Sequence, residues 1–308
     1  MKRLGETLLY WLYRALDGAL ARLPIGLAFR LGQLLGWLGW LALPGYRRLA
    51  VNNLAIAFGG ELDRRAIRKL SRRHFASLGA NLLSGPSLAR ARPSRVRSLV
   101  EVEGLERISR HPDRGIVLVI SHIGNWELFA KLVSLAPGRA HATVFQPLNN
   151  RLIDRHVRAS RQREGLRLFA RQDGFEAPIR HARMGGIVGV LVDQHAGDKG
   201  VWTPLFGRLA STSPLAAMIA LRTGARLVPA AVQTAGVARW KLVVDADIPA
   251  AGATVESLSA RINRALECQV RRRPHDWFWV HNRWKTPRPK FLLHSYRRGV
   301  HLPAGTPP

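Results

Sequence analysis

Short apolar runs alternate with amphipathic segments beyond residue 115, and this alternation constrains the fold more than any other feature of the chain. The runs are rich in Val, Ile and Leu, as buried strands are, and the segments between them carry one apolar helical face. The predicted strands cover residues 115–121, 142–145, 187–193, 226–233 and 240–245. The predicted helices cover residues 126–135, 149–164, 174–184, 214–223 and 255–272. The alternation predicts an α/β layered domain.

The N-terminal segment carries a second constraint. Residues 23–43 are apolar apart from Arg30 and Gln33, and their length is close to the roughly 20 residues that span a bilayer. Residues 7–22 are amphipathic, and no small-residue cleavage site follows, so we predict a retained membrane-associated helical hairpin. Either the second helix spans the bilayer or both helices lie in the interface, where Arg30 reaches toward the head groups. A buried hairpin of a soluble protein is the remaining alternative.

Three regions follow from these patterns. We expect membrane-anchor helices at residues 1–45, a catalytic domain at 46–295 and a flexible tail at 296–308. Within the domain, Asp63 is placed to cap a helix that runs to about Leu83, and Gly85-Pro86 is expected to end it.

The excess of cationic over anionic residues indicates which kinds of molecule the protein binds. Lys and Arg number 48 against 20 Asp and Glu, a formal net charge of +28, and most of the cations are Arg. Such a surface favours anions: phospholipid head groups, nucleic acid or an acidic carrier protein. No zinc-finger, RNA-recognition or helix-turn-helix signature appears, so we predict no nucleic-acid partner. The single cysteine, Cys268, excludes a disulfide framework and a cysteine-based zinc site and fits a cytoplasmic-facing protein.

Candidate chemistry lies at the end of the first predicted strand. His122 and Glu127 form an H-x-x-x-x-E pair directly after the apolar run 115–120. Ligands of open α/β sheets bind at such strand ends. A His with a carboxylate one helical turn away is a general base with an orienting partner, and the carboxylate stabilises the imidazolium once it forms.

Several sequence blocks, taken in order and spacing, carry a family resemblance. The chain resembles the late acyltransferases of lipid A biosynthesis, the lauroyl/myristoyl acyltransferase family within the glycerolipid and lysophospholipid acyltransferases, from about residue 8 to 287. The blocks are Asn53–Phe58, His122–Glu127, Phe145–Asn150, Gly189–Gln194, Gly200–Arg208 with Ser211-Thr212, Leu221–Ala225, Val228-Pro229 and Trp279–Lys285. Two positions depart from the family pattern: Gln146 stands where Arg is frequent, and Ser84-Gly85-Pro86 stands near a frequent acidic position.

The resemblance implies a fold and an activity. It implies a glycerolipid-acyltransferase-like mixed sheet flanked by helices, at the cytoplasmic side of the bacterial inner membrane. It implies transfer of a fatty acyl chain from acyl carrier protein to a hydroxyl of a lipid A precursor, an anionic acceptor. We expect no cofactor, and no metal, because one carboxylate and one His (Asp193 and His195) make no convincing set of ligands. His122 would be the general base and Glu127 its partner. Another acceptor (an aminolipid, a glycolipid or a lysophospholipid) stays open, as does a non-enzymatic nucleic-acid-binding or membrane-adaptor protein.

Further site residues follow from the chemistry and the resemblance. Arginine is the natural clamp for an anionic acceptor, and the candidates are Arg158, Arg161, Arg163 and Arg171. Asp193 and Gln194 end a predicted strand and are expected to bind in the same cleft, where Asp193 orients an arginine or a loop. Backbone N–H groups of Gly124 and Asn125, at a predicted helix start, are oxyanion candidates. The expected wall of the cleft is a loop that contains Phe206, Gly207, Ser211 and Thr212.

Overall fold

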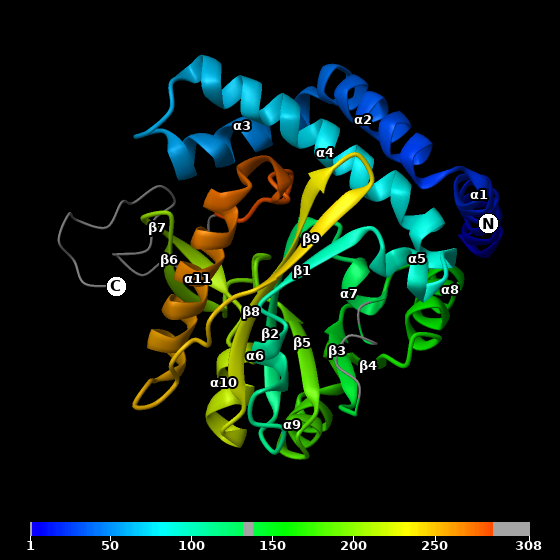
Figure 1. The fold of residues 1–308 in the computed structure, drawn as a ribbon. Coiled ribbons are helices and arrows are strands. Elements are labelled where there is room, and N and C mark those ends of the chain that lie inside the picture. The colour runs from blue at the N-terminus through cyan, green and yellow to red at the C-terminus, as the bar shows by residue number, and fades with distance from the viewer. Residues whose placement is uncertain (1, 132, 134–137, 286–308) are drawn as a thin grey trace.

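The computed structural model describes residues 2–131, 133 and 138–285. Figure 1 shows a central sheet with helices packed around it and the N-terminal helices lying across one end. The predicted α/β fold class is confirmed. The predicted tail, residues 296–308, lies outside the described residues.

The main sheet has seven strands in the order β1-β9-β8-β2-β5-β3-β4. Their bounds are β1 Val100–Glu103, β2 Ile116–Gly124, β3 His141–Phe145, β4 Arg167–Ala170, β5 Ile187–Leu191, β8 Arg226–Gly236 and β9 Arg239–Val244. Strands β8, β2, β5, β3 and β4 are parallel, and β9 runs antiparallel to β8, so the sheet is mixed. The carboxyl ends of the adjacent strands β2 and β5 therefore meet at one edge, which is where parallel sheets place ligands.

Some strands were not predicted. Strands β1 and β4 lie at the two edges of the sheet, span four residues each and carry charged residues, so they show no apolar run. Strands β6 (Val201–Leu205) and β7 (Arg208–Thr212) form a separate antiparallel pair. Pro204 lies within β6, and Phe206 and Gly207 turn the chain with positive φ. This pair occupies the stretch that was expected to be a loop.

Helix α4 (Arg64–Arg90) differs from its predicted end. Asp63 caps it as predicted, accepting the Ala66 N–H at 2.7 Å, but the helix continues through Pro86. An interior proline removes one N–H donor and crowds the carbonyl four residues before it, a cost of about 3 kcal/mol. The last turns stay helical because they are buried: Ser87 and Leu88 lie in the interior, and the Ser87 hydroxyl donates to the Leu20 carbonyl at 2.8 Å.

The other helices agree with the predicted pattern more closely. Helix α11 has the predicted bounds, and α7 begins later than predicted, with residues 132 and 134–137 outside the description. The bounds are α3 Pro44–Phe58, α5 Pro93–Arg97, α6 Glu106–Ser109, α7 Leu128–Lys131, α8 Arg151–Gln162, α9 Glu176–Arg183, α10 Leu215–Thr223 and α11 Val255–Arg272, with 3-10 turns η2 Arg171–Asp173 and η3 Pro274–Asp276.

The N-terminal pair, α1 (Lys2–Arg22) and α2 (Ile25–Ala42), packs mainly on α4 and not on itself as a hairpin (Figure 1). Gly36 of α2 lies so close to α4 that a Cβ there would stand 2.0 Å from the Phe75 carbonyl oxygen. Only glycine permits this approach. Helix α2 is long and apolar enough, by length and composition, to cross a membrane.

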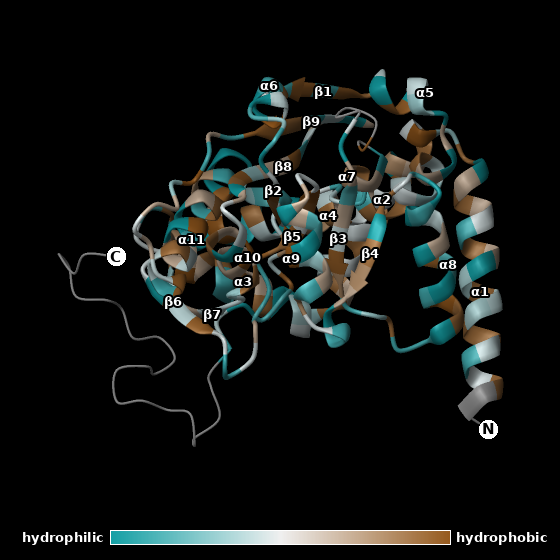
Figure 2. Ribbon diagram, turned by 90° about the horizontal axis from the view of Figure 1, so that it is seen from below, coloured by the Kyte–Doolittle hydropathy of each residue, from teal (hydrophilic) through white to brown (hydrophobic). Residues whose placement is uncertain are grey.

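The core lies on both faces of the main sheet. In Figure 2 apolar residues are concentrated in the central strands, whereas α1 and α8 alternate between apolar and hydrophilic residues. A separate aromatic cluster joins α3, the β6–β7 pair and the C-terminal part of the described chain; it contains Phe58, Phe206, Trp277, Trp279 and Trp284. This cluster brings a segment distant in sequence next to the ends of β2 and β5.

Candidate active site

His122 and Asp193 meet at the carboxyl edge of the sheet. Pairing of β2 with β5 ends at Ile120 and Leu191, so each side chain lies two residues beyond the last paired residue of its chain segment. The His122 Nδ1 atom lies 2.7 Å from Asp193 Oδ1, and the His122 backbone N–H donates to Asp193 Oδ2 at 2.7 Å. The Trp277 indole N–H donates to the same Oδ2 at 2.8 Å. Asp193 is 3% exposed and is held by these three contacts.

The electrostatics of the pair follow from burial and charge. Burial disfavours the imidazolium, but the Asp193 carboxylate outweighs it and raises the pKa of His122. Burial alone would raise the pKa of Asp193, yet His122 and the Trp277 hydrogen bond lower it. An ionised carboxylate only accepts, so Nδ1 carries the proton and Nε2 is left as the basic atom. Trp126 and Phe278 pack against the ring, with centroids 4.9 and 5.9 Å away.

Glu127 does not contact His122 in this structure. Its carboxylate forms a paired contact with Arg161, at 2.6 Å to Nη2 and 3.2 Å to Nε. The expected geometry was wrong because β2 runs on to Gly124, so His122 belongs to a strand and Glu127 is not one helical turn away. Glu127 still faces the same cavity, and its negative charge makes a smaller contribution to the raised pKa of His122.

A cavity of ≈ 630 Å³ opens beside His122. One part of its wall is apolar and includes Leu118, Ile120, Phe129, Val133 and Leu191. Another part carries Glu127, Arg158, Arg161, Arg171, Gln194 and Lys199. A smaller cavity of ≈ 60 Å³ shares Leu118, Phe129, Val133, His141 and Ile187 with the first and continues toward Leu105, Ile108, Leu242 and Val244. We call the cationic part of this wall the basic rim, and its apolar part together with the adjoining smaller cavity the apolar recess.

Three of the four predicted arginines line the cavity. Arg158, Arg161 and Arg171 line the cavity, whereas Arg163, at the C-cap of α8, does not. Arg158 lies over the Phe145 ring at 5.4 Å. Gln194 lines the cavity as expected. Asp193 does not: it is buried behind His122, and it orients His122 and Trp277 rather than an arginine or a loop.

The expected oxyanion and wall residues lie elsewhere. No helix starts at Gly124 or Asn125, since α7 begins at Leu128, and neither residue lines the cavity. Phe206 packs in the aromatic cluster. Ser211 and Thr212 belong to buried β7, where their oxygens accept hydrogen bonds from Arg283, and Gly207 turns the chain between β6 and β7. The wall position is taken by the neighbouring Ser213, Pro214 and Leu215.

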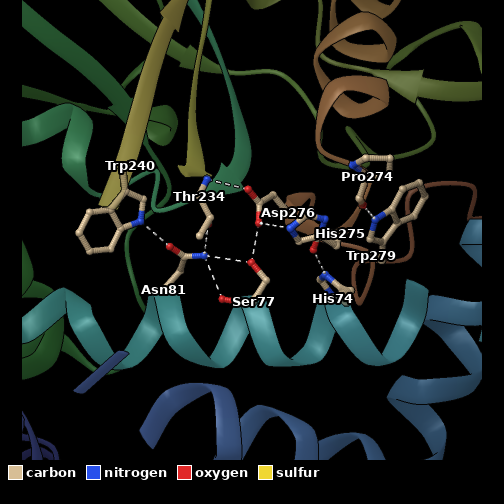
Figure 3. A network of polar contacts seen from close by, with 9 residues as sticks. All are labelled: His74, Ser77, Asn81, Thr234, Trp240, Pro274, His275, Asp276 and Trp279. Carbon is tan, nitrogen blue, oxygen red and sulfur yellow. Dashed lines mark hydrogen bonds and ion pairs between the residues drawn. The ribbon is translucent and has the colours of Figure 1, made fainter. Parts of the chain in front are cut away.

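A second polar network ties α4 to the segment that holds the pair (Figure 3). Asp276 accepts the Ser77 hydroxyl at 2.5 Å and the Thr234 N–H at 2.7 Å. Asn81 accepts the Trp240 indole N–H at 2.8 Å and donates to Thr234 Oγ1 at 3.0 Å. Because Trp277 follows Asp276 directly, this network also positions the Asp193 contact.

One feature of the sequence could have predicted the contact between His122 and Asp193. His122 lies near the carboxyl end of one buried strand and Asp193 follows another, and adjacent parallel strands bring such positions together. The choice of β5 as the neighbour of β2 was not readable from either strand. Trp277 had no local signal, because it reaches Asp193 through the tertiary packing of the aromatic cluster.

Comparison with known proteins gives long matches. The family model for bacterial lipid A biosynthesis acyltransferases matches residues 2–286. The chain is 28% identical over 297 residues to the lipid A biosynthesis lauroyltransferase of Escherichia coli (strain K12), covering 93% of this chain and 95% of that protein. It is 25% identical over 285 residues to the lipid A biosynthesis palmitoleoyltransferase of the same organism, covering 90% and 92%. The matched region includes every residue of the candidate site.

Proposed function

Since the chain belongs to the bacterial lipid A biosynthesis acyltransferase family, we propose that it moves a fatty acyl chain from acyl carrier protein to a hydroxyl of a lipid A precursor. The observation that carries the proposal is the His122–Asp193 pair beside a cavity with an apolar recess and a basic rim. The acyl chain of a thioester matches the recess, and an anionic lipid matches the rim.

The reaction uses His122 as general base. Nε2 takes the proton of the acceptor hydroxyl as its oxygen attacks the thioester carbonyl carbon. The tetrahedral intermediate collapses, the C–S bond breaks, and the imidazolium returns the proton to the departing thiolate. Asp193 keeps Nδ1 protonated and stabilises the imidazolium between the two proton transfers. No acyl-enzyme forms in this scheme.

Glu127 and the arginines act on the acceptor side of the cavity. Glu127 holds the Arg161 guanidinium by two contacts, and its charge favours imidazolium at His122. Arg161, with Arg158 and Arg171 on the same rim, presents paired donors to an anionic group. We therefore retain Glu127 as a residue needed for turnover, with Asp193 in the place next to His122.

The apolar recess is the proposed site of the acyl chain. It runs from Ile120 beside His122, past Leu118, to the smaller cavity at Ile108. Each methylene removed from water contributes about 0.8 kcal/mol. The depth of the recess would then set which chain length is transferred fastest.

Membrane association is proposed to be interfacial. The outer face of α2 exposes Leu27, Leu34, Leu38 and Leu41, between 42% and 53%. Its inner face is seated on α4 through Gly36. A spanning α2 would draw the Arg-rich α4 into hydrocarbon, where charged side chains are costly. An interfacial α2 leaves both helices packed.

We further propose a cellular location and a fold family for the protein. An acyl-carrier-protein donor requires the site to face the cytoplasmic side of the bacterial inner membrane. The mixed sheet with His122 at a strand end supports a glycerolipid-acyltransferase-like fold. A non-enzymatic basic protein would have no need of a clamped His–Asp pair beside a cavity.

The test is the lipid composition of a deletion strain. Mass spectrometry of total lipids should show lipid A short of one acyl chain, restored by the wild-type gene and not by His122→Ala. Loss of a chain from a different lipid would identify another acceptor for the same chemistry. Unchanged lipids in the deletion strain would refute the proposed activity.

A further inference from the structure

A second, cationic hollow lies at the start of α4, and we name it the α4 groove. It has a volume of ≈ 650 Å³ and is lined by Trp40, Asp63, Arg65, Ala66, Arg68, Lys69 and Arg72. None of these residues lines the cavity of His122. The α4 groove is therefore not part of the site described above.

The charge of the α4 groove is unbalanced. Arg65, Arg68, Lys69 and Arg72 follow the i, i+3, i+4, i+7 pattern of one helix face and are exposed. Within the described part of the chain, none of the four forms a hydrogen bond or an ion pair. The carboxylate of Asp63 already accepts the Ala66 N–H at the helix start. Four cations facing one open hollow favour an anion with several oxygens.

An apolar rim borders the same groove. The Trp40 indole N–H donates to the Ser71 hydroxyl at 3.1 Å, and the Arg47 guanidinium lies 5.2 Å from the centre of its ring. Exposed apolar side chains flank Trp40 in the sequence, at the end of α2 and the start of α3: Trp37, Leu38, Leu41, Leu43 and Tyr46. A soluble anion would use only the cations, whereas an amphipathic anion would use the cations and the rim.

We propose that the α4 groove binds the phosphate head group of an anionic phospholipid whose acyl chains lie beside α2 in the bilayer. Arginine pairs with phosphate by two parallel hydrogen bonds, and basic residues near a membrane are attracted to its anionic lipids. The proposal rests on the proposed interfacial membrane association and is independent of the acyl-transfer chemistry. Bound lipid would fix the tilt of α4, which carries the Ser77–Asp276 contact behind the catalytic pair.

The test compares two double variants of equal charge. Arg68→Gln/Arg72→Gln alters the α4 groove, and Arg180→Gln/Arg183→Gln alters α9, at the opposite end of the molecule in Figure 1. All four positions are exposed, and glutamine keeps a high helix propensity, so both variants should fold. Co-sedimentation measures binding to vesicles of phosphatidylcholine alone and to vesicles that also contain phosphatidylglycerol.

The groove variant should bind phosphatidylglycerol vesicles about 10- to 30-fold more weakly, since each basic residue near an anionic surface contributes about fivefold. Its binding to neutral vesicles should be unchanged, and the α9 variant should bind both like the wild type. Equal losses in the two variants would show diffuse charge attraction and overturn the proposal.

Two further outcomes separate this proposal from the others. If the wild type bound neither kind of vesicle, interfacial association itself would fail, while turnover in detergent would still report the acyl transfer. If the groove variant raised the KM for acyl carrier protein in detergent and bound vesicles normally, the groove would dock the carrier and not a lipid.

Discussion

At the scale of residues, the central contact of the site is between the buried Asp193 carboxylate and His122. The carboxylate is buried, contacts both the backbone and the ring of His122, and is itself held by Trp277. Glu127 faces the cavity instead and pairs with Arg161. We therefore propose separable roles for the two carboxylates: Asp193 sets the tautomer of the proposed base, and Glu127 sets the position of a cation on the proposed acceptor side.

Asp193→Asn tests the first role. A neutral base requires His122 unprotonated, so the raised pKa of His122 in the free protein places the acidic limb of kcat/KM above the ordinary value of 6.5. Asparagine removes the charge that raises this pKa, so the limb should move to lower pH while kcat falls by about 10²–10⁴.

The control for this prediction is Glu127→Gln. Glu127 contributes less to the raised pKa of His122, so its removal should shift the acidic limb less, even though turnover falls. The pH profiles of kcat/KM for both variants decide the assignment. A larger shift in Glu127→Gln than in Asp193→Asn would make Glu127 the direct partner.

Arg161 and Arg163 form a matched pair for the acceptor rim. Arg161 lines the cavity and Arg163 does not, although both lie at the end of α8. Hydrogen bonds to a charged group contribute roughly 1.5–3 kcal/mol, so Arg161→Ala should raise the acceptor KM about 10- to 100-fold. Arg163→Ala should leave it unchanged.

Steady-state kinetics with each substrate varied separately measure both effects. A rise in the donor KM alone would assign α8 to carrier docking. Equal effects of the two substitutions would contradict the division of the arginines by the cavity.

At the scale of elements, β2 carries both the base and the wall of the recess. His122 lies near the carboxyl end of the strand, and Leu118, four residues before it, borders both cavities. Strand residues four apart point to the same face of a sheet. One short segment therefore couples the position of the reacting carbonyl to the depth available for the acyl chain.

Leu118→Trp tests this coupling. The larger ring should fill the junction with the ≈ 60 Å³ cavity and exclude the end of a long chain. At about 0.8 kcal/mol per methylene, loss of two methylene contacts should lower kcat/KM for long donors about tenfold relative to short ones. Leu118→Ile preserves the volume and serves as the control. Equal loss for every donor length would place the acyl chain elsewhere.

At the scale of the whole molecule, the apolar faces of α1 and α2 and the cationic α4 groove lie on the same N-terminal layer, which crosses one end of the sheet (Figure 1). The Asp276 network connects that layer to Trp277 and so to the catalytic pair. This arrangement favours a protein that lies on the membrane surface, with its cavity close to the lipids it modifies.

Topology can be measured at a single introduced thiol. Gly5→Cys in a Cys268→Ser background places a cysteine where no atom lies within 4 Å of the new Cβ. An interfacial α2 leaves this thiol on the same side as the catalytic domain, so a membrane-impermeant reagent added outside spheroplasts should not label it, and should label it after lysis. Labelling before lysis would show that α2 spans the bilayer.

The sequence by itself determined what depends on local order. Hydrophobic periodicity predicted the central strands, α8 to α11 and the apolar N-terminal helices, because burial acts on each segment separately. The position of His122 after a predicted strand identified it as the base candidate, and the ordered sequence blocks carried the family resemblance. The edge strands β1 and β4 were not predicted, because each spans four residues and is only partly buried. The helix end predicted at Gly85-Pro86 was wrong, because burial of the last turns of α4 outweighs the cost of an interior proline.

Only the tertiary structure decided the partners. Strand order placed Asp193, 71 residues after His122, against the imidazole, and left Glu127 to Arg161. The aromatic cluster brought Trp277 to the same carboxylate, although it lies 84 residues further along the chain. Separation in sequence carries no information about such contacts, because they arise when adjacent strands and packed helices exclude water together. The candidate for general base was therefore readable from local sequence, and the carboxylate that contacts it was set by the fold.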